Sequence, residues 1–102
     1  MAHKVELRDE ALTDLAALYD YISSESSPEV AIGYVRRIRA ACERLADFPE
    51  RGRQRDDILP GLRVIGFERR VTIAFRVLKT RVEIVTIAYG GRDYEGELRK
   101  RT

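Results

Sequence analysis

The side chains of this sequence that are best suited to chemistry are its arginines. Many of them lie in and around a series of strand-like segments of the second half: Arg51, Arg53, Arg55, Arg63, Arg69, Arg70, Arg76, Arg81 and Arg92. A guanidinium group donates two parallel hydrogen bonds to a carboxylate or a phosphate. The sequence has one histidine, one cysteine and no clustered pair of carboxylates. This inventory favours the binding of anions or acidic protein surface over acid–base or metal chemistry, so we expect no metal ion and no cofactor.

Charge is distributed unevenly along the chain, although the formal net charge is only +2. Residues 1–50 contain 6 basic and 10 acidic side chains, whereas residues 51–102 contain 13 basic and 7 acidic ones. Halves of opposite sign predict a basic face that belongs to the second half. A chain with 16 arginines and 3 lysines also fits a bias in genome base composition, in which case many of these charges are simply solvated.

Size and composition predict one globular domain over residues 1–102. A chain of 102 residues that is 44% hydrophobic can bury one core. No apolar stretch approaches the roughly 18 residues that a membrane span needs. Because a single cysteine cannot form an internal disulfide, we expect a cytoplasmic protein with no membrane contact. His3 is expected on the surface, and Cys42, which lies on an apolar helix stripe, is expected to be a packing residue.

Two amphipathic helices are predicted in the first half. Apolar residues recur at helical spacing over residues 9–24, which predicts the first helix. Ser27 and Pro28 indicate the start of the second, with serine as the N-cap and proline at the first helical position. Its apolar stripe continues to Phe48, and Pro49 is expected to end it. Two such helices joined by a short turn form an αα-hairpin.

The strands predict the fold class. A short strand is expected around Val5 and Leu7, and longer strands over residues 62–67, 71–77 and 82–89. Residues 49–61 are expected to form a polar loop, and residues 93–101 a short helix or a frayed tail. The order β-α-α-β-β-β is typical of an α+β fold, with an αα-hairpin on one face of a largely antiparallel sheet. The other face carries Arg76 and is expected to be at least partly open.

Two series of short motifs give the sequence a resemblance to a known protein family. The first consists of Asp14-Leu15, Leu18-Tyr19-Asp20-Tyr21-Ile22, Pro28 with Ala31, Leu45 with Pro49, and Gly52-Arg53. The second consists of Pro60-Gly61-Leu62-Arg63, Ala74-Phe75-Arg76-Val77, the run from Ile84 to Ile87, and Gly90-Gly91-Arg92-Asp93. In order and spacing, over residues 5–94, the chain resembles the ParE toxins of the RelE/ParE superfamily, which belong to bacterial type II toxin–antitoxin systems.

The resemblance implies a fold, a partner and a target. The fold would be the sheet with a helical hairpin described above. An antitoxin of ParD type, encoded beside the toxin, would mask it. The free toxin would trap DNA gyrase on cleaved DNA. The toxin would therefore contact DNA only indirectly, through gyrase or through the antitoxin.

A second branch of the superfamily, typified by RelE, cuts mRNA on the ribosome with basic residues on the sheet and a C-terminal Tyr or His. The matching strand Arg and C-terminal Tyr fall here at Thr72 and Leu98, whereas Arg63 and Arg92 keep a basic character. The resemblance therefore favours a non-enzymatic gyrase inhibitor. A ribosome-dependent mRNA endonuclease and a non-toxic, toxin-derived binding module are the alternatives. Tyr89 stands where ParE-like sequences often have His.

Three arginines, Arg63, Arg76 and Arg92, are the candidate contacts to the target. For each of them the alternative is a structural ion pair with a neighbouring acid: Arg63 with Asp56, Asp57 or Glu68, Arg76 with Glu83, and Arg92 with Asp93. No residue is assigned a catalytic role.

The helical hairpin and the sheet both offer surface to an antitoxin. We expect an antitoxin tail to pack on apolar side chains of the hairpin wherever the core leaves them uncovered: Leu15, Leu18, Tyr19, Val35 and Ile38. Acidic residues of the tail would be steered towards Arg76 and the rest of the arginine-rich half. The open sheet also offers an edge for strand addition.

Overall fold

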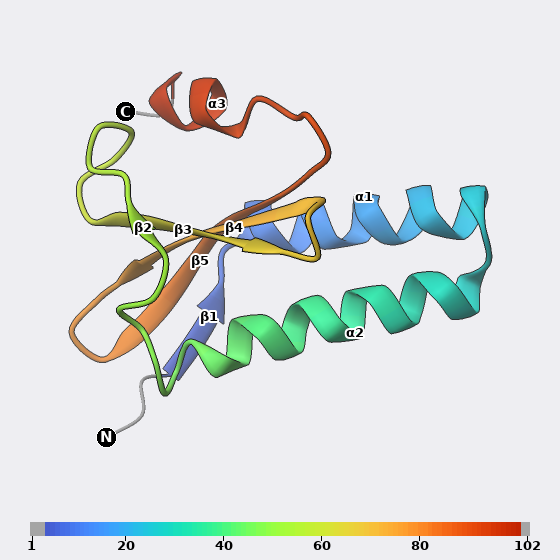
Figure 1. Cartoon of the computed structure of the whole chain (residues 1–102), viewed down its shortest axis with the longest axis horizontal. Coiled ribbons are helices and arrows are strands. Elements are labelled where there is room, and N and C mark those ends of the chain that lie inside the picture. Colours follow the sequence, from blue (N-terminus) through green and yellow to red (C-terminus); the bar gives the residue numbers. More distant parts are fainter. Residues whose placement is uncertain (1–3, 101–102) are drawn as a thin grey trace.

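The fold is described from a computed structural model of the chain, which covers residues 4–100. The elements in chain order are β1 (Lys4–Leu7), α1 (Asp9–Glu25), α2 (Pro28–Arg44), β2 (Arg53–Gln54), β3 (Leu62–Phe67), β4 (Val71–Val77), β5 (Arg81–Tyr89) and α3 (Tyr94–Lys100). In Figure 1, α2 lies below the sheet, α3 lies above it, and α1 and α2 run side by side as a hairpin. The α+β class predicted from the sequence is confirmed.

The five strands form one sheet in the order β1-β5-β4-β3-β2. Neighbouring strands are antiparallel except for β1, which pairs with β5 in parallel. The sequence predicted a largely antiparallel sheet and gave no signal for this parallel pair. The α1–α2 hairpin carries the chain from β1 at one edge of the sheet to β2 at the other, so β1 pairs with the last strand of the chain rather than with the next one.

Each face of the sheet carries its own apolar cluster. Ile73 and Phe75 of β4 pack with the helical hairpin, while Ala74 between them points to the opposite cluster. Alternation along the strand therefore sends successive side chains into different clusters. The second cluster contains Ile58, Leu59, Leu62, Val64, Ala74, Val85 and Leu98. The face expected to be partly open is thus covered in part by α3 and by the segment before β3.

The segment between α2 and β3 is more structured than the polar loop that the sequence predicted. It contains the two-residue strand β2, and its residues Ile58 and Leu59 are buried. Asp56 accepts a hydrogen bond from the amide of Gly61 at 2.8 Å, which closes the turn that leads into β3. Two apolar residues among many charged ones give too short a pattern to be recognised in the sequence.

The helix ends follow local chemistry. Ser27 caps α2 as predicted, and its Oγ accepts a hydrogen bond from the amide of Val30 at 3.1 Å. The helix ends at Arg44 rather than just before Pro49, because the amides of Leu45 and Ala46 bond three residues back and tighten the chain.

Two further predictions concern single residues and membrane contact. Cys42 is fully buried on α2, which confirms its packing role, whereas His3 lies outside the described residues. None of the helices in residues 4–100 combines the length and the apolar character needed to cross a membrane.

Candidate functional site

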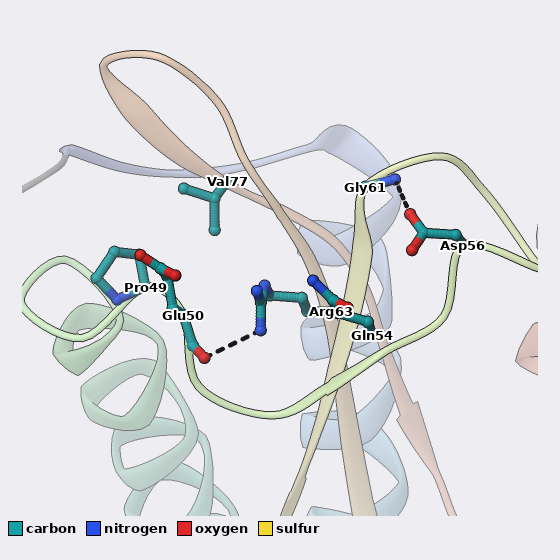
Figure 2. A pocket seen from close by; sticks show the side chains of 7 residues that line it. All are labelled: Pro49, Glu50, Gln54, Asp56, Gly61, Arg63 and Val77. Atoms are coloured by element: carbon teal, nitrogen blue, oxygen red, sulfur yellow. Dashed lines mark hydrogen bonds between the residues drawn. The ribbon is translucent and has the colours of Figure 1, made fainter.

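Arg63 extends from β3 into a polar cavity of about 360 Å³ beside the connection between α2 and β2 (Figure 2). The cavity is lined by Pro49, Glu50, Gln54, Asp56, Gly61, Arg63 and Val77. Arg63 Nη1 donates to the backbone carbonyl of Glu50 at 2.9 Å and more weakly to that of Arg51 at 3.5 Å. The guanidinium is therefore positioned by main-chain oxygens rather than by a carboxylate.

The acidic residues expected to neutralise Arg63 are engaged elsewhere. Asp56 accepts from the Gly61 amide, Asp57 pairs with Arg55, and Glu68 pairs with Arg37. The structural ion pair that was the alternative role for Arg63 is therefore not formed among the described residues. Within residues 4–100, Nε and Nη2 of Arg63 have no hydrogen-bond partner, so this cation retains donors for a ligand.

Arg76 makes the cross-strand pair that the sequence offered as its structural alternative. It lies opposite Glu83 in the β4–β5 register, and its Nη1 stands 4.0 Å from a Glu83 carboxylate oxygen. The contact is loose, and 37% of the Arg76 side chain is exposed. Its Nε atom is buried without a hydrogen-bond partner among the described residues. Arg76 is thus only weakly neutralised.

Arg92 is held far more tightly, and not by Asp93. Its Nη1 donates to Asp14 at 2.6 Å, and its Nε and Nη2 donate to Glu97 at 3.0 and 2.8 Å. The hydrogen bonds to Glu97 and to Asp14 raise the pKa of the Arg92 guanidinium. Asp93 instead accepts a hydrogen bond from the amide of Gly96 in the first turn of α3. Arg92 therefore fastens α3 to α1.

Asp14 has a role that the sequence reasoning missed. Its second carboxylate oxygen accepts from the Thr86 hydroxyl at 2.6 Å and from the Ile87 amide at 2.9 Å. It thereby occupies the edge of β5 beyond the point where β1 ends. The available signal was its position, because Asp14 lies between Ala11 and Leu18 on the buried stripe of α1, where a lone charge needs a partner.

Most of the residues predicted to bind an antitoxin are not on the surface. Leu15, Leu18 and Ile38 are buried in the cluster beneath the hairpin, and Tyr19 and Val35 pack against it. The expectation that the core leaves these side chains uncovered is corrected for the three buried ones. The helical stripe that suggested them is the face turned towards the sheet. The exposed large apolar side chains are Leu12, Tyr21, Val30, Ile32 and Phe48.

The tyrosines form a row of aromatic contacts across one end of the sheet. Tyr89 lies between Tyr21 and Tyr34, with ring centroids 5.8 and 6.3 Å away, and Tyr34 stacks on Phe67 at 6.3 Å. Burial is the main cause that raises the pKa of Tyr34. Tyr89 therefore contributes packing at the position where the sequence departs from the family pattern.

The structure also places Thr72 and Leu98, the two positions at which the nuclease branch would have its strand Arg and its C-terminal Tyr. Leu98 is only 1% exposed and packs in the second apolar cluster. Thr72 is half-buried in β4, opposite Ala88 of β5. A side chain at position 98 with this orientation faces the core and not a substrate.

Comparison with known proteins gives concordant results. Residues 5–94 match the family described as ParE toxin of type II toxin–antitoxin system, parDE. The chain is 29% identical to Toxin ParE3 of Caulobacter vibrioides over 89 residues, which cover 87% of this chain and 88% of the relative. It also resembles a solved structure described as the chromosomal ParDE TA system from P. aeruginosa, with a TM-score of 0.77 and 27% identity. That match covers 87% of this chain and 97% of the other.

Proposed function

The chain belongs to the ParE toxin family and is the toxin of a type II toxin–antitoxin system, and we propose that it inhibits DNA gyrase by binding it without catalysis. In this proposal the toxin contacts DNA only indirectly, through gyrase or through the antitoxin. The protein acts in the cytoplasm, where gyrase works, and needs no cofactor.

The observation that carries this proposal is the state of Arg63. Its guanidinium lies in an open cavity, is oriented by the carbonyl of Glu50, and has no carboxylate partner among the described residues. Such a group is preorganised to donate a bidentate pair to an acidic side chain or a phosphate of the target. Paired arginines such as Arg55 and Arg92 would first have to give up their own carboxylates.

The other two candidate arginines take different roles in this proposal. Arg76, loosely paired with Glu83, is a second contact to the target or to the antitoxin. Arg92 acts through the fold, because it fastens α3 to α1 through Asp14 and Glu97. A target contact by Arg92 would use the 30% of its side chain that is exposed.

The nuclease alternative finds less support in this geometry. A Tyr or His that promotes attack on a phosphate must reach the substrate, but Leu98 is packed among Leu62, Val64 and Val85. The partner that neutralises the toxin is an antitoxin of ParD type, as in the ParDE system that the chain resembles.

Induction of the chain alone, with separate readouts, tests the proposal. Gyrase inhibition predicts arrested growth, DNA breaks that coincide with trapped gyrase, and no codon-positioned mRNA cleavage. Discrete cuts on primer extension of ribosome-bound mRNA would replace this function with the nuclease. Normal growth with neither DNA breaks nor mRNA cuts would replace it with a non-toxic binding module.

A further inference from the structure

The cavity of Arg63 carries charges of both signs. The carboxylates of Glu50 and Asp56 line it together with the guanidinium of Arg63. In the view of Figure 2, Arg63 lies between these two acidic residues. Because two carboxylates stand against one guanidinium, the lining of the cavity has a formal net charge of −1. The cavity is therefore not a simple anion-binding site.

Backbone hydrogen bonds hold these opposite charges apart. Nη1 of Arg63 is fixed on the backbone carbonyl of Glu50 at 2.9 Å, and Oδ1 of Asp56 is fixed by the Gly61 amide at 2.8 Å. Within residues 4–100, Oδ2 of Asp56 and the side-chain carboxylate of Glu50 have no hydrogen-bond partner, and neither acid pairs with Arg63. The cavity thus offers free donors and free acceptors at the same time.

The two acids decide which anion the guanidinium can accept. A phosphate dianion would be attracted by Arg63 but repelled by both Glu50 and Asp56. A carboxylate carries less charge than a phosphate dianion, and a cation beside it would meet the free oxygens of the two acids. The charges of the cavity therefore fit a ligand that brings a carboxylate and a cation together.

The size and the walls of the cavity fit two side chains. Its volume of about 360 Å³ is roughly ten times the ~30 Å³ that one water molecule occupies, so it holds more than a single carboxylate. Pro49 and Val77 supply apolar wall. Long charged side chains pack their methylene groups on such surface while their charged ends reach polar partners.

We propose that the Arg63 cavity takes an oppositely charged pair of side chains from gyrase. An Asp or Glu of the pair accepts hydrogen bonds from Nε and Nη2 of Arg63, and a Lys or Arg donates to Glu50 and Asp56. Such pairs stand side by side when they are three or four residues apart on a helix or opposite each other on neighbouring strands. The two acids of the toxin thereby select against a phosphate or a purely acidic surface. This assignment rests on the proposed function for the identity of the target.

The first test removes the two acids and follows the direction of the effect. The variant Glu50→Gln, Asp56→Asn keeps the backbone carbonyl that holds Arg63 and an acceptor oxygen for the Gly61 amide. The matched control Glu43→Gln, Asp47→Asn makes the same charge change on exposed residues that do not line the cavity. Inhibition of gyrase supercoiling is measured for both folded variants. We expect the cavity variant to inhibit at least about threefold more weakly and the control to be nearly unchanged.

The other results of this test contradict the inference in different ways. Stronger inhibition by the cavity variant would mean that Arg63 binds an anion alone, which overturns the charged pair and leaves gyrase as the target. Unchanged inhibition would overturn the role of the two acids and also leave the target intact. Absence of inhibition by the unmodified chain would overturn the target and the charged pair together.

The second test does not use gyrase. Inorganic phosphate is titrated into the free chain and into the Glu50→Gln, Asp56→Asn variant, and the Nε–Hε signal of Arg63 is followed by NMR. Because the acids repel the dianion, we expect the unmodified chain to bind phosphate at least about tenfold more weakly than the variant. No difference between the two proteins would show that the carboxylates do not control access to Arg63, and would overturn the inference.

Discussion

Arg92 and Asp14 are joined by a 2.6 Å ion pair across 78 positions of sequence. The pair links the segment that leads into α3 with the middle of α1, and only 10% of the Asp14 side chain is exposed. Asp14 also holds the Thr86 hydroxyl and the Ile87 amide, so one carboxylate ties three parts of the chain together. Arg92, in the final Gly-Gly-Arg-Asp motif of the sequence, therefore has a structural role in addition to its proposed role as a target contact.

Replacement of Arg92 by alanine should destabilise the fold. The change leaves the Asp14 carboxylate partly unpaired at a mostly buried site, so we expect the free energy of unfolding to fall by about 2 kcal/mol. The matched control is Arg37→Ala, which removes the exposed pair with Glu68 and should destabilise the fold clearly less than Arg92→Ala does. Urea unfolding of both variants measures the difference. Equal costs for the two variants would contradict the role assigned to Arg92.

Acid should loosen the contact between α3 and the segment before β3. Hydrogen bonds from Arg55 lower the pKa of Asp57 to about 2 and also lower the pKa of Glu95. Carboxyl groups with lowered folded pKa values stabilise the fold above their unfolded values of 3.8 and 4.5. This contribution is lost as the pH falls through the folded values.

The corresponding experiment measures the urea midpoint of unfolding against pH. The midpoint should fall as the pH drops from about 4.5 to about 2. An Arg55→Gln variant should start lower and show a shallower dependence, because it removes the hydrogen bonds that are the largest cause of the lowered pKa values of Asp57 and Glu95. Identical slopes for the variant and the unmodified chain would show that these pairs do not contribute.

Cys42 should be inert to thiol reagents in the folded protein. Burial on α2 raises the pKa of this thiol to about 12, which suppresses the reactive thiolate at neutral pH. Reaction with a disulfide reagent at pH 8 should then proceed only through unfolding and accelerate in urea. Rapid labelling of the native protein would contradict this burial. The same reagent applied to the fully unfolded chain supplies the reference rate.

Regular patterns in the sequence predicted the main elements of the fold. Apolar alternation through Ile73 and Phe75 identified β4, and Ser27 with Pro28 located the start of α2. Both signals depend only on residues that are close in the sequence, so they can be recognised without knowledge of the tertiary structure. The docking of α3 could not be predicted, because its two apolar residues, Tyr94 and Leu98, are too few to establish a periodicity in a seven-residue helix.

The site was harder to predict because pairing of charges is a long-range property. Sequence features do not distinguish Arg63 from Arg92. In the structure, however, Arg63 donates hydrogen bonds to main-chain carbonyls, whereas Arg92 donates them to the carboxylates of Asp14 and Glu97. The apolar stripe that named Leu18 and Ile38 as partner contacts marked the core instead. Sequence spacing identifies a helix face but does not say whether the sheet or a partner covers it.

The measurement that tests the central proposal most directly is gyrase poisoning by Arg63 variants. Supercoiling inhibition and trapped cleavage complexes are measured with purified toxin for the unmodified chain, Arg63→Lys, Arg63→Ala and the control Arg39→Ala. Circular dichroism verifies that each variant is folded. We expect full activity for the control, partial loss for Arg63→Lys, and inhibition weakened by at least about tenfold for Arg63→Ala. Undiminished gyrase inhibition by folded Arg63→Ala would contradict the proposed site, and absence of inhibition by the unmodified chain would contradict the function.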